Sequence, residues 1–362
     1  MLQIEKKKCF TELGKFLSQF SFEQNSKNEA VLHNDLTSLN SASPIGFYDS
    51  FVDLIHLSQS HNGWFTPEQV YHSLQSWAKA LQEDNINQWL SNYDFSKVQP
   101  KTIGLILAGN IPLVGFHDFL SVLISGHKVL VKTSSNDQHL IKFLANYLIA
   151  VNPEMENYIT FTDGKLENFD AVIATGSNNT ARYFEYYFKD KPSIIRKNRN
   201  SVAVLTGEET QEDLVNLGED IFRYFGLGCR NVSKLFVPKG YDFQPFFQAI
   251  YDYKDVIFYE KYSNNYDYNK AVFLMSNFKL LDNEFLTLKE DSSYASPISS
   301  VFYEYYENIE DLKRQLETDA EQIQCIVAKN GIDNSIPFGK TQQPELWDYA
   351  DNVDTLEFLL KV

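Results

Sequence analysis

Residues 102–132 read TIGLILAGNIPLVGFHDFLSVLISGHKVLVK and contain one complete strand–helix–strand pattern. The run 103–108 is short and continuously apolar, as expected of a strand that is buried on both faces of a parallel sheet. A Gly-Asn pair at 109–110 interrupts it, 112–124 is typical of a helix, and 128–132 is again typical of a strand. Because parallel neighbours need a crossover, this stretch predicts a βαβ unit.

The alternation of strand-like and helix-like segments continues to about residue 205. The predicted helices are 137–151 and 179–188. The predicted strands are 158–161, 171–175, 193–195 and 202–205. Strands that alternate with helices form a doubly wound parallel sheet, and such a sheet binds ligands at the carboxyl ends of its strands. The loops expected at these ends are 109–110, 132–135 and 175–178.

The segments on either side of this predicted sheet have other patterns. Residues 1–95 are expected to be mainly helical. After residue 205, an amphipathic helix over 211–225 is expected to end at Gly226, and a strand over 234–237 follows. The tail 357–362 is expected to be a strand, suited to pairing subunits at a sheet edge.

The composition of the 362-residue chain limits the functions and locations that are expected for it. A net charge of −16 argues against non-specific binding to nucleic acid or to anionic membranes. The three cysteines, Cys9, Cys229 and Cys325, are too sparse for a disulfide framework and lack metal-binding spacing, so no metal site is expected. The most apolar stretch, 102–131, is interrupted by polar and charged residues, and the first residues lack an apolar core of signal length. These features indicate a reducing, cytoplasmic location.

Cys229 lies in the segment FGLGCRN, between the expected helix and strand. Gly226 and Gly228 permit a tight turn and a close approach of a ligand to the main chain. Arg230 adds a cation that favours the thiolate, which is the reactive form of cysteine. The segment suits a nucleophile, although a buried structural thiol also fits the cysteine taken alone.

Polar residues follow three of the expected strands. Asn110, in AGNIP, suits either a turn or the donation of its amide to an oxyanion. The turn 132–135, KTSS, offers either a solvated lysine or an ammonium and hydroxyls for a ribose or phosphate. Gly176 and Ser177 precede a helix, whose backbone N–H groups suit a phosphate. The chain contains no GxGxxG motif, so the familiar dinucleotide fingerprint does not support this interpretation.

Five basic residues lie close together in this otherwise acidic chain. They are Lys189, Lys191, Arg196, Lys197 and Arg199. Such a cluster is either a solvated face or a patch that receives the phosphates of a ligand.

Several longer segments together resemble the LuxC-type fatty acyl-CoA reductases of the aldehyde dehydrogenase superfamily. They are LILAGNIP, VLVKTSSND, ATGSNNTARYFE, FGLGCRNVSKLFVP and PFGKTQQPELWDYADNVDTLEFLL, in order from about Lys101 onward. The resemblance implies an aldehyde-dehydrogenase-like α/β fold with two doubly wound domains, a helical N-terminal region and a C-terminal strand tail. The implied parts are 1–100, the helical start of the cofactor domain; 101–205, the NAD(P)-binding domain; 206–340, the catalytic domain with the cysteine; and 341–362, an oligomerisation tail.

The resemblance also implies catalytic roles. Cys229 matches the nucleophile of the family. Asn110 matches the amide that, with the backbone N–H of the nucleophile, binds the oxyanion. His117 is a candidate proton donor by residue type alone, and a packing role is the preferred interpretation.

Further matches concern the cofactor. Lys132 matches the lysine at the adenosine ribose or its 2′-phosphate, with Ser134 and Ser135 in the same turn. Gly176-Ser177 matches the turn near the pyrophosphate. Glu290 matches the glutamate at the nicotinamide ribose.

Two departures from the superfamily pattern refine the expected chemistry. Hydrolytic aldehyde dehydrogenases carry a water-activating Glu before the nucleophile, whereas the corresponding stretch 197–201, KNRNS, has no acid. An acyl-enzyme without that base is expected to exchange with CoA instead of water. NAD-preferring members often carry a Glu three residues after the ribose lysine, where this chain has Ser135, so NADPH is favoured over NADH.

The expected activity is therefore the NAD(P)H-dependent reduction of an acyl-CoA, expected to be fatty, to an aldehyde through an acyl-cysteine. Coenzyme A is then part of the substrate, and a partner acyl-transfer protein is the other donor considered. A homo-oligomer is expected. The alternatives are an NAD(P)-dependent aldehyde dehydrogenase that produces an acid, and a non-catalytic subunit of an acyl-transfer complex.

Overall fold

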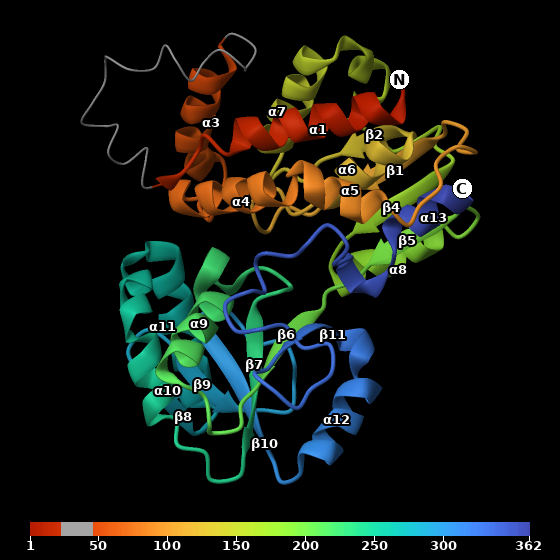
Figure 1. The fold of residues 1–362 in the computed structure, drawn as a ribbon. Helices are drawn as coiled ribbons and strands as arrows, with labels where there is room; N and C mark the ends of the chain where they lie inside the picture. Colours follow the sequence, from red (N-terminus) through yellow and green to blue (C-terminus); the bar gives the residue numbers. More distant parts are fainter. Residues whose placement is uncertain (23–45) are drawn as a thin grey trace. The chain divides into compact units, whose positions relative to one another are not determined.

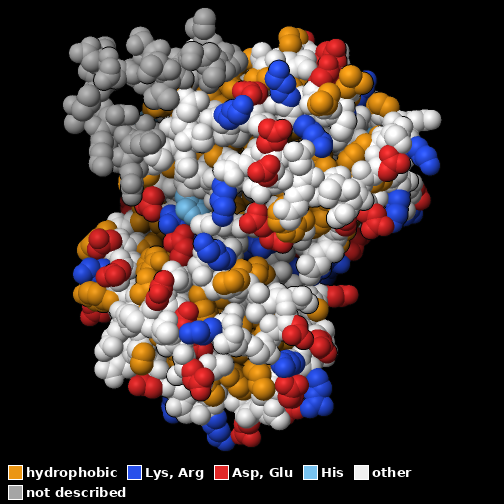
Figure 2. Space-filling view, viewed as in Figure 1, with side chains coloured by type: hydrophobic (Ala, Val, Ile, Leu, Met, Phe, Trp, Pro, Cys, Tyr) orange, Lys and Arg blue, Asp and Glu red, His pale blue; other side chains and the backbone are white. Residues whose placement is uncertain are grey.

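The computed structural model describes residues 1–22 and 46–362 (Figure 1). These residues form two compact units. The first comprises Met1–Lys197 together with Glu345–Val362, and the second is Asn198–Pro344. On the face drawn in Figure 2, acidic and basic side chains are interspersed over both units. Among the described residues, no helix is both long and apolar enough to cross a membrane.

The first unit contains a five-stranded sheet whose neighbouring strands are all parallel. Its strands are β1 Thr102–Ile106, β2 Lys128–Lys132, β3 Ile159–Phe161, β4 Ala171–Thr175 and β5 Ser193–Arg196, in the order β3-β2-β1-β4-β5. Ile103 in β1 is paired with Val129 on one side and Ala171 on the other. The predicted βαβ unit is confirmed, with β1 as the central strand and β2 beside it.

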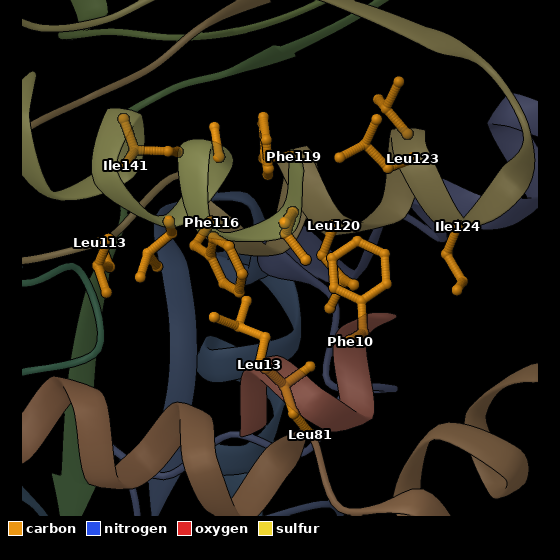
Figure 3. Close-up of a cluster of buried hydrophobic side chains, with 14 of the residues drawn as sticks. Phe10, Leu13, Leu81, Leu113, Phe116, Phe119, Leu120, Leu123, Ile124 and Ile141 are labelled. Atoms are coloured by element: carbon orange, nitrogen blue, oxygen red, sulfur yellow. The ribbon is translucent and has the colours of Figure 1, made fainter. Parts of the chain in front are cut away.

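Helices surround this sheet. They are α1 Gln3–Leu17, α3 Phe47–His61, α4 Pro67–Ala80, α5 Glu83–Leu90, α6 Phe116–Ser125, α7 His139–Val151, α8 Asn178–Tyr187 and α13 Thr355–Lys361, with short 3-10 turns at Pro153–Asn157 and Ala350–Asn352. The crossover helix α6 is buried along its whole length. Figure 3 shows its Phe116 and Leu120 on the side of the helix that faces Phe10 and Leu13 of α1. This core fixes the start of α6, and with it the loop that follows β1.

The strand expected at 357–362 is wrong, because these residues belong to the helix α13. Leu356 and Leu359 are three residues apart and both buried, which is a helical spacing. The Asp354 side chain caps the helix by accepting a hydrogen bond from the Glu357 N–H at 2.8 Å. The Leu359 carbonyl oxygen lies 2.9 Å from Nε2 of His127. The tail therefore completes the first unit and presents no strand edge.

The second unit contains a six-stranded sheet in the order β11-β6-β7-β10-β9-β8. Its strands are β6 Asn200–Val204, β7 Val232–Pro238, β8 Leu280–Asp282, β9 Thr287–Glu290, β10 Ser300–Tyr306 and β11 Ile323–Val327. All neighbours are parallel except β8 and β9. The helices are α9 Gln211–Phe222, α10 Gln244–Ala249, α11 Glu260–Met275 and α12 Ile309–Thr318, with 3-10 turns at Arg223–Gly226, Ile250–Phe258 and Ala320–Gln322.

The division between the units differs by one strand from the boundary drawn at residue 205. β6 pairs with β7 and β11 in the second sheet, where Ser201 is in register with Val232. The sequence of a short apolar strand does not indicate which sheet the strand joins. The sequence pattern therefore placed β6 with the preceding strands. The roles assigned to the two domains remain predictions.

Candidate functional site

The loops after β1 and β2 pack directly against each other at the carboxyl edge of the first sheet. A Cβ added at Gly109 would lie 2.7 Å from Ser134 Oγ and 3.0 Å from the Asp137 backbone nitrogen, closer than carbon atoms tolerate. Glycine is therefore required for this approach. The contact brings the loop of Asn110 beside the turn that follows Lys132, as the doubly wound topology predicts.

Asn110 is exposed in an irregular loop that is held at several points. The Ser73 hydroxyl donates to the Pro112 carbonyl at 3.0 Å. Leu113 has a left-handed backbone, with φ of 58°, and its N–H donates to Asp137 Oδ2 at 2.7 Å. Burial raises the pKa of Asp137 to about 7, against the opposing effect of the Leu113 N–H. The loop is thus anchored from outside its own sequence.

Lys132 is half-buried at the end of β2, where its ammonium donates to the Gly164 carbonyl at 2.8 Å. An ammonium has three donors, so this bond orients the group and leaves it able to bind an anion. The Ser134 hydroxyl accepts a hydrogen bond from the Asn136 N–H at 3.2 Å. Ser135 is exposed.

Gly176 and Ser177 lead from β4 into α8. The Ser177 hydroxyl caps this helix by accepting from the Thr180 N–H at 3.3 Å. A Cβ at Gly176 would lie 3.0 Å from the Thr180 side chain, so a larger residue would crowd the turn. The groups that this turn offers an anion are therefore the backbone N–H groups at the start of α8.

The basic cluster is not a continuous patch, because Arg196 is buried. Its guanidinium donates to both carboxylate oxygens of Asp118, at 2.7 and 3.2 Å, and to the Ala350 carbonyl at 2.7 Å. Arg196 therefore holds the C-terminal segment of the first unit. Lys197 pairs with Glu185 at 2.6 Å on the surface.

His117 also has a structural contact. Its Nε2 lies 2.8 Å from the Leu346 carbonyl oxygen, and burial lowers its pKa. The hydrogen bond and the burial fit a packing residue better than a proton donor.

In the second unit, Cys229 follows an unusual turn. The helix expected to reach residue 225 ends at Phe222, because Tyr224 and Phe225 have left-handed backbones with φ of 52° and 58°. Gly226 continues the turn with φ of 75°. Left-handed conformations at bulky residues are costly and persist where the surroundings enforce them. Cys229 follows this turn and is exposed three residues before β7 begins.

The buried side chain of Asn231 enforces this conformation. Its Oδ1 accepts the Gly228 N–H at 2.8 Å. Its Nδ2 donates to the carbonyls of Asp220 and Arg223 at 3.0 and 2.8 Å, at the end of α9. One amide therefore connects the helix end to the residue before Cys229, and it satisfies carbonyls that the helix leaves unpaired.

A second contact fixes the Cys229 main chain. The Ser201 hydroxyl donates to the Cys229 carbonyl at 2.9 Å and also lies 2.9 Å from Cys325 Sγ. Ser201 is the last residue of the stretch 197–201. This stretch corresponds to the segment in which hydrolytic aldehyde dehydrogenases are expected to carry the water-activating Glu. A hydroxyl that donates to a carbonyl is not a general base, which agrees with the acid-free sequence.

Arg230 is held through a third loop. Its Nε donates to the Thr341 carbonyl at 2.7 Å. The Asp220 carboxylate accepts hydrogen bonds from the Gly339 and Thr341 N–H groups, at 2.7 and 3.0 Å. Burial raises the pKa of Asp220 to about 6. The guanidinium next to Cys229 thus has a defined position.

Glu290 ends β9 and is exposed, whereas its neighbour Lys289 is buried. The Lys289 ammonium pairs with Asp291 and lies 3.9 Å from the centre of the Phe278 ring. The residues on either side of Glu290 are therefore joined by an ion pair.

Asp137, Asn231 and Asp220 were not predicted from the sequence. A signal for Asn231 was present, because Asn side chains often form hydrogen bonds to nearby backbone groups in turns. No group of three or more His, Cys, Asp or Glu residues arranged for a metal ion occurs within residues 1–22 and 46–362.

The fold is that of the aldehyde dehydrogenases. It matches a putative aldehyde dehydrogenase, PutA, from Anabaena variabilis at a TM-score of 0.56 and 13% identity, covering 97% of this chain and 92% of that chain. It matches an aldehyde dehydrogenase from Mycobacterium tuberculosis, solved with NAD+, at a TM-score of 0.56 and 12% identity, covering 89% of this chain and 73% of that chain.

Residues 52–249, more than half of the chain, match the family model for acyl-CoA reductase (LuxC), and the chain belongs to that family. The matched range includes Asn110, Lys132 and Cys229. A long-chain acyl-protein thioester reductase from Aliivibrio fischeri is 22% identical over 168 aligned residues, a match that covers 42% of this chain and 35% of that relative. The match thus spans about a third of the relative's length.

Proposed function

We propose that this chain reduces an acyl-CoA thioester to an aldehyde with NAD(P)H, through a thioester on Cys229. The observation that carries the proposal is the exposed thiol of Cys229 at the end of a left-handed turn, with its main chain held by Ser201. Cys9 is buried and Cys325 is half-buried, so Cys229 is the thiol that a substrate reaches most easily.

In the first step the Cys229 thiolate attacks the thioester carbonyl, and the C–S bond to CoA breaks as the acyl–cysteine bond forms. The Asn110 amide and the Cys229 N–H stabilise the negative oxygen of the tetrahedral intermediate. Removing one such donor elsewhere costs about 2.7–4 kcal/mol of transition-state stabilisation. CoA leaves as a thiolate and takes a proton from water.

The residues at the strand ends of the first sheet fit a dinucleotide. The Lys132 ammonium, the Ser134 and Ser135 hydroxyls and the backbone at Gly176-Ser177 suit a ribose and phosphates, and Glu290 suits the nicotinamide ribose. When bound, the nicotinamide supplies a hydride to the acyl carbon. Cys229 holds that carbon in place until its sulfur leaves as a thiolate and the aldehyde is released.

NADPH is the proposed cofactor, with NADH as the alternative. The position expected to bear a carboxylate in NAD-preferring relatives is Ser135, which is exposed. A carboxylate there would repel a 2′-phosphate, whereas Lys132 attracts one.

The absence of an acid in 197–201 supports reduction over the production of a free acid. Without a base to activate water, the acyl-enzyme survives until hydride transfer. If product analysis with an aldehyde and NAD(P)+ gave free acid without CoA, the aldehyde dehydrogenase alternative would hold instead.

The acyl group is proposed to be a fatty chain, and the reaction is proposed to take place in the cytoplasm. The relative from Aliivibrio fischeri is named for an acyl-protein thioester, so a carrier protein is the second donor to test. A homo-oligomer remains a proposal, and α13 removes the tail strand that was expected to pair subunits.

The test is to mix the protein with a long-chain acyl-CoA and NADPH, then NADH, and to follow the loss of nicotinamide absorbance. We expect aldehyde and CoA in equal amounts and no turnover by Cys229→Ser. If neither cofactor is oxidised with short or long acyl-CoA or with an acylated carrier protein, the proposed activity is wrong.

A further inference from the structure

We propose that Asp137 is a positioning residue for Asn110, acting through the backbone N–H of Leu113. The proposal rests on the proposed function, in which the Asn110 amide binds the oxyanion. Asp137 lies between β2 and α7, far from Asn110 in the chain, and it does not belong to the groups assigned to the substrate or cofactor.

The contact itself is short and shielded from solvent. Asp137 Oδ2 accepts the Leu113 N–H at 2.7 Å, and the two residues are 7% and 1% exposed. A buried hydrogen bond to a carboxyl group is worth more than an exposed one, because water does not compete for either partner. Asp137 thus determines the direction of the peptide that follows Pro112.

Leu113 needs this support because of its conformation. A φ of 58° is unfavourable for a residue with a branched side chain. Its side chain is buried at the edge of the core cluster that also contains Phe116 (Figure 3). The residue is therefore fixed on one side by apolar packing and on the other by Asp137.

The consequence for Asn110 follows from the rest of the loop. The Ser73 hydroxyl fixes the Pro112 carbonyl at 3.0 Å, and Gly109 leaves no room beside Ser134. Asn110 lies between these fixed points. Loss of the Leu113 contact removes a hydrogen bond that holds the same peptide as the Ser73 hydroxyl does. An amide displaced by about 1 Å loses much of its effect on a transition state.

Asp137 has a further property that a purely structural acid would not need. Its Oδ1 is buried, and no described residue forms a hydrogen bond with it. A buried polar atom without a partner costs stability. A carboxyl group buried at this cost agrees with a role in the active site.

The test is a double-mutant cycle on the acylation step, measured without nicotinamide by quench-flow and intact-mass detection of the acyl-enzyme. Asp137→Ala is expected to slow acylation at least 10-fold while the dissociation constant of NADPH changes less than twofold. Asp137→Asn keeps an acceptor for the Leu113 N–H and is expected to recover most of the rate. In an Asn110→Ala background, Asp137→Ala is expected to have less than a twofold effect.

Asp118→Asn is the matched control, since it alters another buried acid of the same unit. It is expected to lower the melting temperature while leaving the acylation rate within twofold of the wild-type rate. If the losses of Asp137→Ala and Asn110→Ala multiply, or if Asp137→Ala weakens NADPH binding as much as it slows acylation, the inference is wrong. If the wild-type protein forms no acyl-enzyme at all, the proposed function fails first.

Discussion

The Asn231 side chain accepts the Gly228 N–H at 2.8 Å, so a residue beyond Cys229 fixes the residue before it. The same side chain donates to the carbonyls of Asp220 and Arg223. The position of the thiol therefore depends on one amide that binds in three directions.

Replacing Asn231 with Asp should keep a side-chain oxygen that accepts the Gly228 N–H and remove the amide N–H groups that donate to the carbonyls. We expect roughly 100-fold slower acylation and a loss of about 1–3 kcal/mol in the free energy of unfolding, because buried carbonyls lose their partner. Asn269→Asp is the control, since Asn269 is also buried and donates to the Ile298 carbonyl at 3.0 Å. Stopped-flow kinetics and urea unfolding report both quantities; equal kinetic losses in the two variants would argue against a specific role for Asn231.

The three thiols should differ in their rates of alkylation. Cys229 is exposed, whereas burial raises the pKa of the Cys9 thiol and removes it from solvent. Iodoacetamide is expected to modify Cys229 at least 10-fold faster than Cys9 or Cys325, as followed by peptide mass spectrometry. Faster labelling of Cys325 would count against Cys229 as the nucleophile, and equal labelling of all three would indicate an unfolded sample.

Cofactor preference should depend on the turn after β2. Ser135→Glu is expected to raise the KM for NADPH at least 10-fold, or about 1.4 kcal/mol, and to leave the KM for NADH nearly unchanged. Lys132→Met should weaken NADPH more than NADH. Lys128→Met, at the exposed start of β2, is the control. An unchanged ratio of the two KM values in both test variants would remove this turn from the cofactor site.

Arg196 should matter for stability and not for the cofactor. Arg196→Met leaves Asp118 buried without its cation, and breaking such a pair costs roughly 3–5 kcal/mol. We expect a lower midpoint of urea unfolding and an unchanged KM for NADPH when the variant is assayed well below its melting temperature. A large rise in that KM with stability intact would restore the phosphate-binding interpretation of the cluster.

Asp137 should make stability depend on pH. Its pKa is raised to about 7, from about 3.9 in an unfolded chain, so the native state binds a proton that the unfolded state releases between these values. The stabilisation that this bound proton gives the folded state is therefore present at low pH and is lost as pH rises to about 7. In urea unfolding, Asp137→Asn should gain stability relative to the wild type as the pH rises from 5 to 8. Asp190 is an exposed acid in the same unit, and for Asp190→Asn the difference from the wild type in the free energy of unfolding should not change with pH. A flat difference for Asp137→Asn as well would contradict the raised pKa.

The strands of the first sheet could be predicted because each is a short apolar run ended by glycine or polar residues, as at residues 103–108. The tail could not, because LEFLL is apolar enough for either structure, and its helix is selected by the Asp354 cap and by packing in the first unit. Local pattern alone does not contain that packing.

Some residues of the candidate site could likewise be predicted from the sequence, and others could not. Cys229, Asn110 and Lys132 could be proposed as site residues from the sequence, because their residue types carry chemistry and their order matches a family. Asp137 and Ser201 form hydrogen bonds with residues distant in the chain, Leu113 and Cys229, and these partners are visible only in three dimensions. The left-handed turn before Cys229 was hidden because Tyr224 and Phe225 continue an apolar helical pattern.

The chain leaves the first unit after Lys197 and returns to it at Glu345. During synthesis on the ribosome, Asp118 and Arg196 emerge long before Thr355, whose hydroxyl accepts a hydrogen bond from the Arg196 guanidinium at 2.9 Å. The whole second unit is translated in the interval. The first unit is therefore still incomplete when the second unit, which contains Cys229, has all of its own residues available to fold.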